Sequence, residues 1–205
     1  MALAAYADLI SAVADWMARN SINADRANDF IALAEADFNR VLRVTSMEKR
    51  AATTIEAGDA YLSMPTNCLG LRVLTHDTTP FEELQYVTSD WMRTRLMRLN
   101  MGRPKFYAQF GSEFQLGPLP DQDYDFEAIY YERIPALTSL ATSNWLLDRN
   151  PDIYLFGALV QCALFYQNDA LLARYQPLLQ QKLDDLRASE QTIEFNGSPL
   201  QTRVS

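Results

Sequence analysis

The spacing of hydrophobic residues changes twice along the chain, and this change most restricts the fold. Between residues 3 and 19 apolar side chains recur at intervals of three or four, which predicts an amphipathic helix. After the turn formed by residues 20–25, a second helix is expected from about Arg26 to Arg43. Because a short turn usually makes neighbouring helices antiparallel, we expect these two helices to form a hairpin.

The helical period disappears between residues 47 and 134, where β-forming residues and turn signals take its place. Gly58-Asp59 and Gly111-Ser112 each separate two short runs that are rich in β-branched or aromatic residues. Further strands are predicted around residues 69–75 and 126–131. One short helix is expected over residues 89–99, with Ser89 as its N-cap. The middle of the chain is therefore predicted to be a β-rich insertion.

Helical patterns return after Pro135. Asn150-Pro151 is a helix start with a capping Asn and Pro at the first helical position. The following segment, residues 153–167, is apolar almost all round, which predicts a central buried helix, and its Gly157 suggests close approach of another backbone. A last helix is expected from Ala170 to about Ser189, kinked or interrupted at Pro177.

Together these patterns predict an α+β fold that is mainly α. Its body is a helical bundle formed by residues 1–46 and 135–190, namely the N-terminal hairpin and the C-terminal helices. Residues 47–134 form the β-rich insertion, which contains the short helix at 89–99. Residues 191–205 have no strong period and are expected to be an extended, flexible C-terminal tail.

The charge balance bears on the class of partner. With 26 acidic against 18 basic residues, the net charge is -8, so binding of DNA through the whole surface is not expected. No run of about 18 apolar residues occurs, which argues against a membrane span. The N-terminal segment lacks the basic region of a signal peptide. Without a secretory signal, Cys68 and Cys162 are expected to be reduced, small core residues.

Residues with catalytic or ligand chemistry are sparse. His76 is the single histidine and is interpreted as a surface loop residue, and no CxxC, HExxH or glycine-rich phosphate loop is found. The alternating acids from Asp121 to Glu127 partly resemble a calcium loop, but Phe126 occupies the place of the required glycine. No catalytic residue, metal or cofactor is therefore predicted, although a site built from carboxylates alone stays open.

One basic segment departs from the acidic background. Its cationic residues, with no acid among them, are Arg93, Arg95, Arg98, Arg103 and Lys105. A charge run of this kind is usually a solvated face. The alternative is a contact patch for an acidic partner surface or for passing nucleic acid.

Three stretches resemble tailed-phage head-to-tail adaptor proteins, also called connectors. The first runs from AEADFNRVLR to YLSMP, the second is YYERIPALTSLATSNWLLDRNPDIYLFGALV, and the third is the Trp16/Arg19 end of the first helix. The motifs occur in the family's order over most of residues 10–170 and match least in residues 76–105 and the tail. The matching positions are Glu35, Arg40, Leu42, Arg43, Tyr61, Met64, Pro65, Tyr130, Arg133, Ile134, Pro135, Leu137 and 144–159.

The resemblance implies a viral structural protein of the virion that is made in the host cytoplasm and is not an enzyme. Such subunits form a homo-oligomeric ring of about twelve copies below the portal protein, where heterologous contacts close on themselves. The ring extends the DNA channel, through which DNA passes without sequence-specific binding, and docks the tail or nozzle proteins. No membrane is involved.

Two site hypotheses follow. The basic segment is expected to contact a partner or a neighbouring subunit. The tail is expected to order on binding the portal, through Gln191, Phe195, Leu200 and Arg203. The alternatives are an enzyme with a carboxylate-only site and a small acidic regulatory binding protein. A cleft with converging acids would favour the first alternative, and a stable monomer would favour the second.

Overall fold

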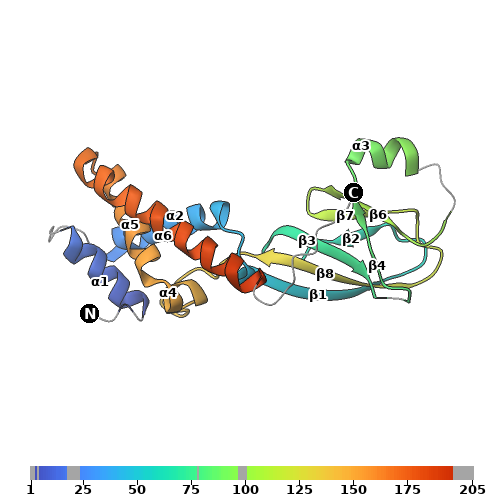
Figure 1. Cartoon of the computed structure of the whole chain (residues 1–205), viewed down its shortest axis with the longest axis horizontal. Helices are drawn as coiled ribbons and strands as arrows, with labels where there is room; N and C mark the ends of the chain where they lie inside the picture. Colours follow the sequence, from blue (N-terminus) through green and yellow to red (C-terminus); the bar gives the residue numbers. More distant parts are fainter. Residues whose placement is uncertain (1–2, 4, 18–23, 78, 97–100, 196–205) are drawn as a thin grey trace. The chain divides into compact units, whose positions relative to one another are not determined.

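The computed structural model describes residues 3, 5–17, 24–77, 79–96 and 101–195 (Figure 1). The chain divides into two compact units, one made of Met1–Ser46 with Ile134–Ser205 and the other of Met47–Arg133. The first unit is helical, and the second contains two four-stranded sheets. The fold class is therefore mixed α+β, as the change of hydrophobic period predicts.

The helical unit is organised around α5 (Pro151–Phe165), whose buried residues lie on all its sides. Around it pack α1 (Tyr6–Trp16), α2 (Ala24–Val41), α4 (Trp145–Arg149) and α6 (Asp169–Phe195). Trp16 on α1 contacts the rings of Phe156 and Tyr175 with centroids 6.0 and 6.3 Å away. The prediction of a buried helix is confirmed for most of its length, because a helix that is apolar almost all round must be covered in water, although Leu164 and Phe165 at its end are exposed.

Gly157 marks the closest approach of α2 to α5. A Cβ atom at this position would lie 2.5 Å from Cζ of Phe38 and 3.1 Å from Cβ of Ala34. The expected close approach is therefore present, but the side chains of α2 make it and not its backbone. Phe38 is held there by an edge-on contact with Tyr154, with ring centroids 5.4 Å apart.

Three details of the helices differ from the sequence prediction. Asn150 precedes α5 but its side chain makes no capping hydrogen bond, whereas Asn144 caps α4 by accepting from the N–H of Leu147 at 2.9 Å. Pro177 lies inside α6 without interrupting it, and α6 continues to Phe195, beyond the expected end near Ser189. Residues 191–195 are thus helical and not part of an extended tail.

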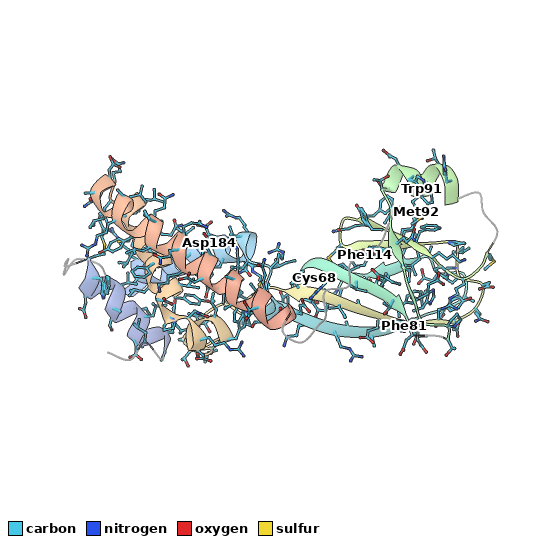
Figure 2. The ribbon with its side chains drawn as sticks, viewed as in Figure 1. Cys68, Phe81, Trp91, Met92, Phe114 and Asp184 are labelled. Carbon is cyan, nitrogen blue, oxygen red and sulfur yellow. The ribbon has the colours of Figure 1, made fainter. Side chains whose placement is uncertain are left out.

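In the second unit the strands form two facing sheets. One sheet has the order β1 (Glu48–Ile55), β8 (Tyr124–Glu132), β3 (Cys68–His76), β4 (Glu82–Glu83). The other has the order β2 (Tyr61–Ser63), β7 (Glu113–Gly117), β6 (Phe106–Phe110), β5 (Gln85–Tyr86). Their inner faces enclose a core of Ile55, Leu62, Leu74, Leu84, Tyr107, Phe114, Leu116, Tyr124, Phe126 and Ala128. Figure 2 shows Phe114 within this unit.

Two turns of this unit depend on glycine. Gly58 and Gly111 both have positive φ, 84° and 59°, which side chains rarely adopt. Gly111 joins β6 to β7 in the predicted hairpin, with Phe110 paired to Glu113. The 3₁₀ turn η1 (Thr45–Met47) precedes β1, and α3 (Ser89–Trp91) with the π-helical turn η2 (Met92–Leu96) lies between β5 and β6. Thr88, and not Ser89, is the N-cap of α3.

Candidate assembly surfaces

A buried set of polar side chains holds the segment that follows β8. Asn39 on α2 accepts a hydrogen bond from the N–H of Ile134 at 2.9 Å, and Glu35 accepts from the N–H of Leu137 at 2.8 Å. Asn144 donates to the carbonyl of Pro135 at 2.7 Å. An irregular buried segment needs such partners, because its backbone groups have no helix or sheet to pair with.

Tyr154 links these groups. Its hydroxyl accepts from Nδ2 of Asn144 at 2.7 Å and donates to Oε1 of Glu35 at 3.1 Å. Burial, reinforced by the nearby Glu35 carboxylate, raises the pKa of Tyr154 far above its ordinary value, so the hydroxyl stays a neutral donor. Glu35, Asn39, Asn144 and Tyr154 are all buried, so they shape the unit from inside and offer no surface to a partner.

The basic segment begins on a short helix that is anchored by its apolar side. Met92 is buried with Ala108, and Trp91 packs on Phe106 with ring centroids 5.1 Å apart (Figure 2). Arg93 and Arg95 are exposed, and the Arg95 guanidinium lies 6.0 Å from the centre of the Trp91 ring. This arrangement exposes two cations to solvent on a helical segment that the apolar contacts hold in place.

Two other cations of the basic segment, Arg103 and Lys105, are described. Arg103 donates to the carbonyl of Pro80 and lies 3.9 Å from the carboxylate of Glu82, so it braces the loop before β4. Lys105 is exposed beside β6. Arg98 lies outside the described residues. Arg93 and Arg95 are therefore the described residues that best fit a contact patch.

The predicted portal-binding residues fall into two groups. Gln191 and Phe195 lie in the last turns of α6, where Gln191 is exposed. Leu200 and Arg203 lie outside the described residues, so their role stays a prediction. Just before Gln191, Glu190 accepts hydrogen bonds from the backbone N–H and hydroxyl of Ser46 at 3.2 and 3.0 Å. These bonds tie the end of α6 to the residue before the second unit, Met47–Arg133, which we call the β unit.

His76 is not the surface loop residue that the sequence suggests. It ends β3, is fully buried, and its Nε2 lies 2.7 Å from the carbonyl oxygen of Pro104. Its ring also packs against Phe126 and Tyr124, with centroids 4.4 and 5.1 Å away. Burial, with the added repulsion of the Arg103 cation, lowers the pKa of His76 despite the bond to Pro104. The residue is therefore a buried core group of the β sandwich.

The remaining candidates for chemistry have structural roles. Asp121, Asp123 and Asp125 accept hydrogen bonds from the Tyr124 hydroxyl, the Ala57 N–H and the Thr54 hydroxyl, so they fasten the turn before β8. Within the described ranges no group of three or more His, Cys, Asp or Glu could hold a metal ion. Cys162 is buried and Cys68 is partly buried. The calcium-loop resemblance therefore has no support in the geometry.

Comparison with known protein families identifies the family of this chain. A family model described as SU10 adaptor protein matches residues 4–203. The chain belongs to the SU10 adaptor protein family. This is a family of phage head-to-tail adaptors, and comparison with individual curated proteins finds no match. Membership indicates a structural component of the virion that associates with portal and tail proteins.

In this adaptor some of the positions behind the family resemblance lie in the interior, whereas others, such as Arg40, Tyr61 and Arg133, are exposed. Glu35, Pro135 and Asn144 hold the segment after β8, and Ile134 and Leu137 are buried beside them. Sequence reasoning found these positions but not their common role, because Glu35 and Tyr154 are 119 residues apart. Over the described part of the chain, no helix is long and apolar enough to cross a membrane.

Proposed function

We propose that this adaptor forms a closed ring of identical subunits below the phage portal, extends the DNA channel and docks the tail or nozzle proteins. The observation that carries the proposal is the match of the family model to nearly the whole chain, residues 4–203. A ring of one subunit type requires two different, complementary surfaces on each copy. A net charge of -8 suits a channel along which DNA slides without sticking.

The helical bundle body and the β unit would then offer separate surfaces to separate partners. The exposed cations Arg93 and Arg95 are the proposed contact for an acidic partner or neighbouring subunit. The segment from Gln191 onward, with its helical start at residues 191–195, is the proposed portal contact. A structural role of this kind needs no catalytic residue.

The mass of the protein in solution, measured alone and with the portal ring of the same phage, tests the proposal. We expect a ring-sized particle, or ring formation that depends on the portal. A monomer that ignores the portal under all conditions would contradict it and would favour a small regulatory binding protein.

Charge reversal tests the basic patch. Arg93→Glu with Arg95→Glu should abolish attachment of the partner or assembly, because opposite charges across an interface set orientation and encounter rate. Lys49→Glu with Arg133→Glu changes the net charge equally at two other exposed cations of the same unit and shows the effect of charge alone. Assembly and tail docking of the Arg93/Arg95 variant at the wild-type level would remove the patch from the proposal.

A further inference from the structure

The β unit has two unlike sides. On one side the segment Phe81–Tyr86 crosses between the sheets, since β4 pairs with β3 and β5 pairs with β6. Leu84, between these two short strands, is buried in the shared core. This side of the sandwich is closed by the chain itself.

The opposite side is open. Here β1 and β2 are the edge strands of the two sheets, and a cleft of about 370 Å³ lies between them. Its lining includes Ile55, Leu62, Phe114 and Phe126. Thr53 pairs with buried Phe126 and so faces inward, yet it is exposed. An inward-facing residue that remains exposed marks a place where the sandwich lacks a covering element.

The opposite side, formed by β4 and β5, carries exposed aromatic side chains that could fill this cleft. Phe81 and Tyr86 are 67% and 61% exposed, although both are aromatic. Tyr86 pairs with Tyr107, whose ring packs on Phe114 in the core, so Tyr86 shares the inner face of its sheet. Exposed aromatic residues of this kind are typical of protein interfaces.

The strand register shows which residues would meet if a second copy continued both sheets. Glu82 is level with His76, Phe126 and Thr53 across the first sheet, and Glu83 is level with Ala52. Across the second sheet Tyr86 lies in the same row of paired residues as Tyr107 and Leu116. The neighbouring row, one residue along β7, contains the pair of Tyr61 with Gln115. The exposed aromatic therefore comes beside the mouth of the neighbour's cleft.

Strand direction and charge also agree with such a contact. β4 runs antiparallel to β3, as does β8, so β4 would run antiparallel to β1 of the next copy. Glu83 would then lie diagonal to Arg50 on the outer face, within reach of an opposite-charge pair. An edge strand with unpaired backbone groups is a template for pairing with another chain.

We infer that the β4–β5 side of one copy docks on the open β1–β2 side of the next, with Tyr86 and Phe81 covering the cleft. The contact is head-to-tail, so repeating it produces a ring if the rotation closes. The inference rests on the proposed function, because it supplies the contact between subunits that a ring requires.

Two variants that each block one side test it. Thr53→Arg places a bulky charge in the cleft, whereas Phe81→Asp with Tyr86→Asp removes the aromatic side chains that would cover it. Thr66→Arg is the matched control, because its side chain adds the same charge at an exposed turn of the same unit, outside the cleft lining. Native mass spectrometry follows each protein and an equimolar mixture of the two blocked variants, with and without the portal ring, and circular dichroism checks folding.

We expect each blocked variant to stay monomeric at concentrations where the wild type and Thr66→Arg assemble. The mixture should yield one-to-one dimers, because each variant keeps the side that the other has lost. Rings from either variant alone, or a mixture without dimers while the wild type assembles, would overturn the inference. A wild type that never assembles would instead defeat the proposed function, and the inference with it.

Discussion

At the scale of single residues, the adaptor is held by a few tightly constrained contacts. Gly157 is one of them, because α2 lies against α5 with no room for a side chain. Gly157→Ala should lower the free energy of unfolding, since an overpacking cost of about 1–3 kcal/mol exceeds the helix-propensity gain of up to about 1 kcal/mol. Chemical denaturation measures the change. Adding Phe38→Leu should recover part of the loss, and a Gly157→Ala variant as stable as wild type would contradict the tight contact.

At the same scale, His76 makes the stability of the protein depend on pH. Its pKa is lowered in the folded state, so the unfolded chain binds the proton more readily as the pH falls below about 6.5. The stability is therefore complete above that pH and declines as the pH falls toward the folded-state pKa. We expect this loss to be smaller in His76→Gln, which keeps a side-chain donor for the carbonyl of Pro104. Thermal unfolding of the wild type and of His76→Gln between about pH 5 and 8 measures the two pH dependences. If the stabilities of both proteins fell equally with pH, His76 would be excluded as the cause.

At the scale of elements, the end of α6 can be tested by truncation. Because α6 runs to Phe195, a chain that stops after Phe195 should unfold like wild type. A chain that stops after Glu190 also loses the last helical turns and should be less stable, by about 1 kcal/mol or more, because Glu190 would then sit at a frayed end. Thermal melts of the two truncations measure this, and portal binding of the longer one isolates the role of residues 196–205. Equal stability of both would show that residues 191–195 contribute nothing.

Elements also show what sequence alone can predict. The β6–β7 hairpin and the buried α5 depend on local signals, a glycine turn and an all-apolar run, and both are confirmed. The location of His76 depends on the pairing of β3 with β8, which is distant in sequence, and with β4, which is only two residues long. The local sequence pattern therefore suggested a loop. The hydrogen bonds around Glu35 likewise join distant segments, and the uninterrupted helix through Pro177 reflects its tertiary packing.

At the scale of the whole molecule, the β unit is an insertion whose two ends lie side by side. Glu48 at the start of β1 pairs with Tyr131 near the end of β8. A fragment of residues 47–133 should therefore fold alone with a cooperative transition and β-type circular dichroism, because its core is complete within the unit. Joining Ser46 to Ile134 through a short glycine linker should leave a folded helical remainder. An unfolded fragment would show that the two units depend on each other for stability.

The pairing of β1 with β8 has a mechanical consequence. A pull on the two ends of the β unit acts on neighbouring antiparallel strands at the same end, at Glu48 and Tyr131. Such a load opens the ladder hydrogen bonds one after another, as a zipper opens, and never loads them all at once. Under such a load the ladder would therefore begin to open at its Glu48–Tyr131 end, before the core of the β unit is disturbed.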